Sequence, residues 1–302
     1  MIERGGEVTK TPVGRFLTWD HDFVFATIRR TGYWDKHLLP VFEQNTDKSS
    51  VVIDVGAHCG FFSVFFAKRV RKVYAVEPQP YIFSILERNI ALNNCKNIQA
   101  LNVAAYDRET TLSIAPEKDQ TVANLPMKGG KIDYSKTNNS AGIALSPKPG
   151  EIPASKLDDL IPKDEIVSFI KCDAQGADLR ALKGATNIIR KCRPIIIFEF
   201  EQGLAKIYCE TWQDYEAFFD RIKYSLTPIT NPSNPVGRKS YQDYMCKPFG
   251  PSLRKVFLLS MLIRQKTRKS RAILSKLRLL DLGQKTFHRQ SSDLIGRAYL
   301  IS

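Results

Sequence analysis

The sequence predicts a doubly wound α/β fold, in which a mostly parallel sheet carries helices on both faces. Three observations lead to this prediction. Short apolar runs rich in β-branched residues recur along the chain without polar alternation, as expected of strands that are buried on both faces. Helical patterns separate these runs, which is the order of repeated βαβ units. A glycine turn joins the first run to the helix that follows it.

The first strand and its turn lie in residues 51–68, which read VVIDVGAHCGFFSVFFAK. Asp54 ends the strand, and Gly56 and Gly60 bracket the turn, so the backbone can bend sharply and lie close to a ligand. Backbone N–H groups and the helix dipole favour a nucleotide-like ligand at such a turn. The spacing DxGxxxG lacks the third glycine of the dinucleotide fingerprint, which argues against a nicotinamide cofactor.

Glu77 ends the next expected strand, residues 73–76, about 23 positions after Asp54. A carboxylate at this place can accept hydrogen bonds from both hydroxyls of a ribose. The turn and the carboxylate together therefore predict a nucleoside site with ribose binding rather than pyrophosphate binding. The alternative is an ordinary βα turn followed by a solvated glutamate.

The other elements follow from hydrophobic periodicity, which is weak only at the start of the chain and in its middle. Helices are expected at residues 21–30, 35–43, 61–68, 80–94, 177–190 and 211–223, and strands at 98–103, 166–172, 195–198, 224–229 and 241–245. Residues 1–20 have no periodic pattern. Residues 107–154 are rich in Gly, Pro, Lys, Asn and Ser, which predicts a hairpin and mobile loops that could line the acceptor site, with an exposed loop at 138–142.

Asp173 and Glu199 are the candidate catalytic residues, because they end the fourth and fifth expected strands. In open α/β sheets ligands bind at the carboxyl edge, where these two side chains would meet. Asp173 is expected to contact the acceptor or to accept its proton, and the alternative role is an N-cap for the following helix. The pair could also hold a divalent cation, but no dense cluster of ligands indicates a metal site.

Two stretches resemble the FkbM family of class I methyltransferases, which use S-adenosylmethionine. The first is DVGAHCGFFS at residues 54–63, followed by AVEP at 75–78. The second is FIKCDAQGADLRALKGA at 169–185, which is similar to the family's run IKIDVEGAELEVLKGA. The resemblance covers roughly residues 30–202 of the chain.

The resemblance implies an S-adenosylmethionine site formed by the glycine turn, the ribose carboxylate and the end of the third strand, where related enzymes hold the adenine. The residues implied for the cofactor are Asp54, Gly56, Ala57, His58, Gly60, Ser63, Glu77, Pro78, Asn102, Ala104 and Ala105. The chain departs from the family at His58, where Asn is usual, and at Gln175 and Asp178, where Glu is usual. These departures concern the polar contacts more than the fold.

The function expected from the residues and the resemblance is an O-methyltransferase that moves a methyl group from S-adenosylmethionine to a hydroxyl. An in-line displacement depends mainly on alignment, so few reactive groups are needed. The family implies a sugar or glycan as the acceptor. Two alternatives stay open, namely methylation of RNA ribose hydroxyls, which the positive charge favours, and a non-catalytic nucleotide fold that serves as an adaptor for membrane or nucleic acid.

The chain has 302 residues and 43% hydrophobic content, enough for one sizeable core and an appendage. We expect a helical lead-in at 1–45, the methyltransferase domain at 46–250 and a basic, helical extension at 251–302. Residues 252–302 hold twelve Lys and Arg and two Asp, which is +10 of the chain's +14. With the apolar run 256–263, the extension can lie on an anionic membrane surface; the alternatives are nucleic-acid binding and packing on the domain.

The cysteines and the hydrophobic pattern predict the compartment. The six cysteines form no CxxC pair, which indicates free thiols in a reducing compartment. The first residues include basic side chains but no apolar stretch, so a cleaved secretory signal is not expected. No apolar run approaches the ~18 residues of a membrane span. A cytoplasmic protein is therefore expected, with peripheral attachment to a membrane surface as an option for the basic extension.

Overall fold

The computed structural model describes residues 6–116, 125–128, 131–231 and 241–249. Within these residues the largest sheet has seven strands in the order β14-β15-β13-β12-β3-β4-β5. The strands are β3 (Val51–Val55), β4 (Lys72–Val76), β5 (Ile98–Leu101), β12 (Phe169–Cys172), β13 (Ile195–Glu201), β14 (Tyr224–Pro228) and β15 (Tyr241–Pro248). The five strands from β13 to β5 are parallel. At one edge β15 runs antiparallel to both of its neighbours, β13 and β14. The predicted doubly wound α/β fold is confirmed.

The strand order reverses between β3 and β12. From β3 the chain proceeds outward to β4 and β5, and it later returns to β12 and continues to β13 on the other side. In the register of this central pair, Asp54 lies opposite Lys171 and Val55 opposite Cys172. A crevice forms outside the carboxyl ends of the strands at such a point, and ligands of doubly wound folds bind there.

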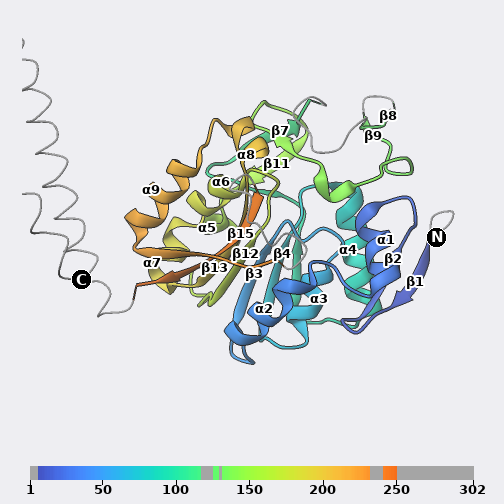
Figure 1. Ribbon diagram of the computed structural model, residues 1–302, viewed down its shortest axis with the longest axis horizontal. Coiled ribbons are helices and arrows are strands. Elements are labelled where there is room, and N and C mark those ends of the chain that lie inside the picture. The colour runs from blue at the N-terminus through green and yellow to red at the C-terminus, as the bar shows by residue number, and fades with distance from the viewer. Residues whose placement is uncertain (1–5, 117–124, 129–130, 232–240, 250–302) are drawn as a thin grey trace, which may run out of the picture. The chain divides into compact units, whose positions relative to one another are not determined.

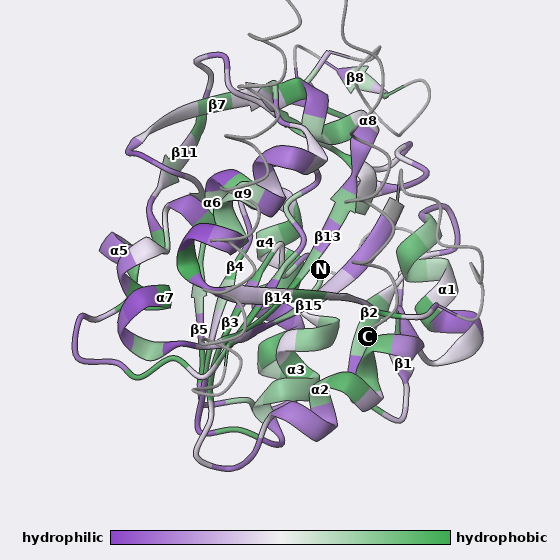
Figure 2. Cartoon of the chain, turned by 60° about the vertical axis from the view of Figure 1, so that its left-hand side comes forward, coloured by the Kyte–Doolittle hydropathy of each residue, from purple (hydrophilic) through white to green (hydrophobic). Residues whose placement is uncertain are grey.

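Helices cover both faces of the central sheet (Figure 1). One layer contains α1 (Phe23–Thr31), α2 (Leu39–Asn45), α3 (Phe61–Ala67) and α4 (Pro80–Leu92), and the other contains α5 (Leu157–Leu160), α6 (Asp178–Lys183), α7 (Thr186–Cys192) and α9 (Trp212–Ile222). Alternate residues of β3 face the two layers, since Ile53 packs in the core with α6 and α9 whereas Val52 packs with α1 to α3. In Figure 2, β3 and β4 are coloured mostly as hydrophobic, as expected of strands buried on both faces.

The structure corrects the expectation for the first residues. β1 (Glu7–Lys10) and β2 (Arg15–Thr18) form an antiparallel hairpin where no pattern was found. Phe16 and Leu17 of β2 are buried in the core, and the backbone N–H of Leu17 donates to the side-chain carbonyl of Asn89 in α4 at 2.8 Å. Strands of four residues are too short to show a reliable alternation, so this hairpin depends on contacts with α4.

The region 107–154 contains more regular structure than expected. A second sheet has the order β10-β7-β11-β6. Its strands are β6 (Ala104–Ala105), β7 (Thr110–Ile114), β10 (Leu145–Ser146) and β11 (Ile152–Ser155). β8 (Met127–Lys128) pairs with β9 (Lys131–Ile132), which confirms the predicted hairpin. The expectation that the rest of the region 107–154 consists of loops is wrong, because β7, β10 and β11 are strands. They are stabilised by pairing with segments distant in the sequence, so their own periodicity does not reveal them.

The predicted helix 177–190 is broken into α6 and α7 at Gly184. A Cβ at this glycine would lie 1.9 Å from the carbonyl oxygen of Tyr106, so the close approach of the two backbones ends α6 there. The remaining short helices in the described part of the chain are η1 (Lys36–Leu38), η3 (Ser140–Gly142), α8 (Gln202–Ala205) and η4 (Lys206–Tyr208). The predicted helix 35–43 therefore begins as a 3₁₀ turn.

The predicted basic extension, residues 251–302, lies outside the described residues, so its role stays a prediction. Among the residues that the structure does describe, no helix has the length and apolar character needed to span a bilayer. The six cysteines are all free thiols, as predicted.

Candidate functional site

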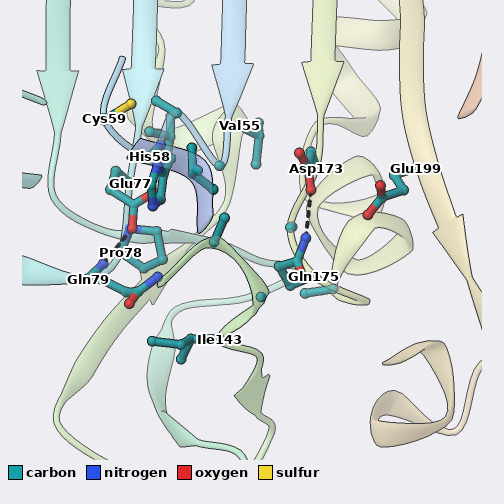
Figure 3. Close-up of a pocket in the computed structure, with 18 of the residues that line it drawn as sticks. Val55, His58, Cys59, Glu77, Pro78, Gln79, Ile143, Asp173, Gln175 and Glu199 are labelled. Atoms are coloured by element: carbon teal, nitrogen blue, oxygen red, sulfur yellow. Dashed lines mark hydrogen bonds between the residues drawn. The ribbon is translucent and has the colours of Figure 1, made fainter. Parts of the chain in front are cut away.

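A cavity of about 250 Å³ lies at the carboxyl ends of the central strands (Figure 3). It is the place that the reversal of strand order predicts. Of the residues proposed for the site from the sequence, those that line the cavity are Gly56, Ala57, His58, Glu77, Pro78, Ala104, Ala105, Asp173 and Glu199. The structure thus brings together residues from β3, β4, the second sheet, β12 and β13.

Four of the proposed cofactor residues do not line the cavity, namely Asp54, Gly60, Ser63 and Asn102. They instead support the residues that do line it. Asp54 is fully buried and accepts a hydrogen bond from the Ser63 hydroxyl at 2.6 Å. The side-chain amide of Asn102 donates to the backbone carbonyls of Glu77 and Pro78, at 2.9 and 3.2 Å. Gly60 begins α3 with a φ of 83°, a conformation that favours glycine.

The glycine turn after β3 packs tightly against the end of β12. Gly56 has a φ of 69°, and a Cβ at this position would lie 1.8 Å from the carbonyl oxygen of Asp173. The backbone N–H groups of Gly56 and Ala57 both donate to the carbonyl of Val76 at the end of β4, at 2.9 and 3.0 Å. The turn therefore connects three neighbouring strand ends, and only glycine fits where it crosses β12.

Glu77 is buried at the base of the cavity with a fixed carboxylate. Its Oε2 accepts a hydrogen bond from the backbone N–H of His58, and its Oε1 accepts one from that of Gln79, both at 2.9 Å. Burial raises the pKa of Glu77 to about 7, although the two backbone hydrogen bonds oppose this shift. Each carboxylate oxygen has a further lone pair with which to accept a hydrogen bond from a ligand.

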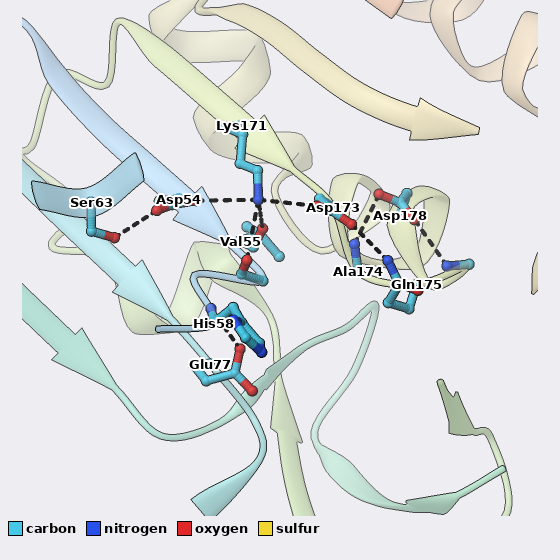
Figure 4. Close-up of polar contacts among 12 residues, drawn as sticks. Asp54, Val55, His58, Ser63, Glu77, Lys171, Asp173, Ala174, Gln175 and Asp178 are labelled. Carbon is cyan, nitrogen blue, oxygen red and sulfur yellow. Dashed lines mark hydrogen bonds and ion pairs between the residues drawn. The ribbon is translucent and has the colours of Figure 1, made fainter. Parts of the chain in front are cut away.

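Asp173 is oriented by two side chains and does not cap the following helix (Figure 4). Its Oδ2 lies 3.3 Å from Nζ of Lys171, and its Oδ1 accepts a hydrogen bond from the side-chain amide of Gln175 at 3.0 Å. Asp178 instead accepts the backbone N–H groups of the turn, those of Ala174 and Gly176, at 3.1 and 3.2 Å. The alternative role of Asp173 as a helix cap is therefore not observed, and its carboxylate lines the cavity.

Three further carboxylates, from Glu199, Glu201 and Asp35, line the same cavity. Asp35 has a φ of 37°, an uncommon left-handed conformation for a residue other than glycine. Burial raises the pKa of Asp35 to about 6, and the charges of Asp243 and Asp173 act in the same direction. Among the described residues, no group of three or more His, Cys, Asp or Glu is arranged to hold a metal ion.

The comparison with protein families decides the identity. The model of the family described as "Methyltransferase FkbM domain" matches residues 54–226, which is more than half of the chain. The chain belongs to the FkbM family of S-adenosylmethionine-dependent methyltransferases. The match begins at the end of β3 and extends into β14, so it includes the turn after β3 and the whole of β4, β12 and β13.

Several known proteins are similar to this FkbM methyltransferase. Methyltransferase sdnD of Sordaria araneosa is 23% identical over 56% of the chain and 69% of its own length, and methyltransferase 1 of Beauveria bassiana is 24% identical over 45% and 58%. The crystal structure of methyltransferase FkbM from Methylobacillus flagellatus has a TM-score of 0.42 at 18% identity, over 65% of this chain and 43% of that one. TYW2 of M. jannaschii in complex with AdoMet has a TM-score of 0.42 at 13% identity, over 81% and 87%.

Three residues of the loop 138–142 of this FkbM methyltransferase, Asn139, Ala141 and Gly142, line the cavity. The expectation that the loop is exposed is wrong for most of its residues, since only Asn138 is exposed. Ser140 is buried, and its backbone N–H donates to Oδ2 of Asp22 at 2.6 Å. Its hydroxyl lies 2.8 Å from Nε2 of His58, within hydrogen-bond distance. Burial lowers the pKa of His58 to about 4, so the imidazole is neutral near pH 7. The side-chain amide of Gln79 also donates to the Ser140 carbonyl, at 3.4 Å.

Sequence reasoning missed Lys171 and Asp35 in the site of this FkbM methyltransferase. Lys171 had a detectable signal, because a lysine between Ile170 and Cys172 is the one charged residue of a strand that is otherwise apolar. Asp35 had no such signal, because it lies in the turn between α1 and α2 and not at the end of a strand.

Proposed function

We propose that this enzyme transfers the methyl group of S-adenosylmethionine to a hydroxyl of a sugar or glycan, with Asp173 as the base. The observation that carries the proposal is the position of the Asp173 carboxylate. It lines the cavity at the reversal of strand order and is oriented by Lys171 and Gln175 instead of capping a helix. A carboxylate held in this way is available to accept a proton from an acceptor hydroxyl.

The residues of the cavity suit the proposed donor. Gly56 allows a ligand and the β12 backbone to approach the turn, and Glu77 offers a buried carboxylate for the two ribose hydroxyls. Ala104 and Ala105 add small apolar surfaces for the adenine. When bound, the donor supplies an electrophilic methyl group on a sulfonium. The protein's contribution is then to hold donor and acceptor in line, which can lower the barrier by about 7–11 kcal/mol.

The side chain of Asp173 is proposed to take part in the chemistry by accepting a proton. An alcohol keeps its proton near neutral pH, so a positioned carboxylate that accepts this proton as the oxygen attacks typically contributes about 10² to 10⁴-fold. Lys171 keeps Oδ2 of Asp173 in place, and Gln175 donates to Oδ1. Glu199, which lies in the neighbouring strand β13 two residues before its end, is proposed to contact other hydroxyls of the acceptor.

The charges of the cavity favour a sugar or glycan over RNA. Asp35, Asp173, Glu199 and Glu201 line it, and the charge of the buried Lys171 is already shared between carboxylates. A phosphate beside the reacting hydroxyl, as in RNA, would be repelled by this set. An uncharged polyol can instead donate hydrogen bonds to the carboxylates.

An aromatic pair in the same cavity supports a ring-shaped acceptor. Phe23 is 56% exposed and packs edge to face on Trp34, with ring centroids 5.9 Å apart, and both line the cavity. An exposed phenylalanine is unfavourable in water, and the C–H face of a sugar ring would cover it. RNA ribose is the second candidate acceptor, because the chain carries a net charge of +14.

A screen with methyl-labelled S-adenosylmethionine tests the proposed acceptor. We expect label to be transferred to neutral glycosides or glycans and not to RNA, whose phosphates would face the carboxylates of the cavity. Nucleotide sugars should be poorer acceptors than the matching neutral glycosides if their phosphates lie near the reacting ring. Transfer to RNA alone would contradict the sugar acceptor and would support the second candidate.

Donor binding should depend on pH through Glu77. The ionised carboxylate is proposed to accept hydrogen bonds from the ribose hydroxyls, and burial raises its pKa to about 7. Protonation below this value should weaken binding, so the Kd of S-adenosylhomocysteine should rise about tenfold between pH 8 and pH 6. Calorimetric titrations over this range measure the effect.

The control for the pH dependence is Glu77→Gln. Asp35 and Asp178, with pKa values raised by burial to about 6 and about 7, also change protonation in this range and stay present in the control. A flat profile in Glu77→Gln therefore assigns the dependence to Glu77. An equal slope in both proteins would contradict the assignment.

A further inference from the structure

Lys171 is a buried cation at the centre of the sheet. It lies in β12 opposite Asp54 of β3, and its side chain is only 5% exposed. Its neighbours in the strand, Ile170 and Cys172, are buried and apolar. A lysine is rarely buried to this degree unless its ammonium group is paired.

The ammonium group of Lys171 contacts both halves of the cavity (Figure 4). On one side Nζ lies 3.3 Å from Oδ2 of Asp173. On the other side it lies 3.5 Å from Oδ1 of Asp54, and it donates to the backbone carbonyls of Val55 and Gly56 at 3.5 and 3.1 Å. The carbonyl of Val55 ends β3 and that of Gly56 begins the glycine turn, so one cation joins the start of this turn to the carboxylate after β12.

The two neighbouring carboxylates favour the charged form of Lys171. Burial alone would lower the pKa of Lys171, but the charges of Asp173 and Asp54 outweigh it and raise the pKa above the usual value. The carboxylate of Asp54 is fully buried, and its other oxygen, Oδ2, accepts a hydrogen bond from the Ser63 hydroxyl. Lys171 therefore stays charged near neutral pH, between the turn and Asp173.

We propose that Lys171 is a positioning residue that couples the donor-binding turn to Asp173, so that a change in either one is transmitted to the other. The proposal rests on the proposed function, because it takes the turn as the donor site and Asp173 as the base. The simpler alternative is that Lys171 only neutralises buried carboxylates. In that case the turn and Asp173 would respond independently to substitution.

A double-mutant cycle on donor binding separates the two alternatives. The four proteins are the wild type, Lys171→Met, Asp173→Asn and the protein that carries both substitutions. The probe is S-adenosylhomocysteine, whose sulfur carries no charge, and the readout is its Kd by calorimetry. No acceptor is needed. Asp173→Asn should raise Kd about threefold or more when Lys171 is present and should have little effect after Lys171→Met.

Removal of Lys171 leaves Asp54 as an uncompensated buried charge, which can prevent folding. The cycle is therefore repeated with Asp54→Asn in all four proteins, so that no corner holds that unpaired carboxylate. In this background Lys171 still has Asp173 and the carbonyls of Val55 and Gly56 as partners. The coupling should persist there, because the proposal does not require the Asp54 charge.

Ser168→Ala provides the matched control for the cycle. The hydroxyl of Ser168 accepts the backbone N–H of Val51 at 3.0 Å and so joins β12 to β3 at their amino ends, away from the cavity. Its effect should combine additively with that of Asp173→Asn. Additive effects of Lys171→Met and Asp173→Asn in both backgrounds would overturn the coupling and leave the proposed function intact. If S-adenosylhomocysteine does not bind the wild-type enzyme, the proposed function itself fails.

Discussion

Asp173→Asn should lower turnover by about 10² or more while the protein stays folded. The substitution keeps the shape of the side chain but removes the carboxylate that would accept the proton of the acceptor hydroxyl. The Kd of the donor should change much less than turnover, because Glu77 and the glycine turn provide the donor contacts. Initial rates of transfer from methyl-labelled S-adenosylmethionine measure the effect, and circular dichroism checks the fold.

Glu201→Gln is the matched control, since Glu201 also lines the cavity from β13 but has no contact with Lys171 in the described structure. It should lower turnover clearly less than Asp173→Asn does. Turnover of Asp173→Asn near the wild-type rate would remove Asp173 from the mechanism. Rates before and after exhaustive treatment with EDTA test the alternative of a bound cation, and full activity after treatment would dismiss it.

Gly56→Ala should destabilise the enzyme by about 3 kcal/mol or more. The φ of 69° disfavours a residue with a Cβ by about 1–2 kcal/mol, and the new methyl would lie 1.8 Å from the Asp173 carbonyl. Forcing such a contact typically costs a further ~1–3 kcal/mol. Urea unfolding measures the loss, and donor binding should fall with it because the turn must move away from β12.

Gly203→Ala is the control for Gly56→Ala. Gly203 lies in α8, and the nearest atom to a Cβ there is Oε1 of Glu201 at an ordinary 3.6 Å. Alanine should therefore stabilise the protein slightly, by about 0.4–1 kcal/mol. Equal stability of Gly56→Ala and the wild type would show that the turn does not need glycine.

The central sheet and the glycine turn were predictable because their signals are local. The run of apolar residues before Asp54, the two glycines and the carboxylate of Glu77 lie at spacings that the fold itself imposes. Asp173 and Glu199 were proposed by the same rule, as residues expected to end parallel strands. Both line the cavity, although β13 continues past Glu199 to Glu201. These positions needed no knowledge of contacts between distant segments.

Other parts of the site depend on such contacts. The loop 138–142 reads as an exposed loop because it is polar. Ser140 is nevertheless buried, and its hydroxyl lies within hydrogen-bond distance of His58, which is 82 positions away in the chain. The role of Asp178 in the turn after β12 was likewise hidden, because Asp173 and Asp178 both precede or begin the same helix. Composition cannot decide which of two carboxylates turns toward the backbone and which toward the cavity.

The central claim is that this cavity binds S-adenosylmethionine through the turn and Glu77, and calorimetry of Glu77→Ala tests it most directly. The loss of a charge-assisted hydrogen bond is worth roughly 1.5–3 kcal/mol. The wild-type enzyme should therefore bind S-adenosylmethionine saturably at one site, and Glu77→Ala should raise the Kd about tenfold or more. An unchanged Kd in Glu77→Ala, or no binding to the wild type, would contradict the account.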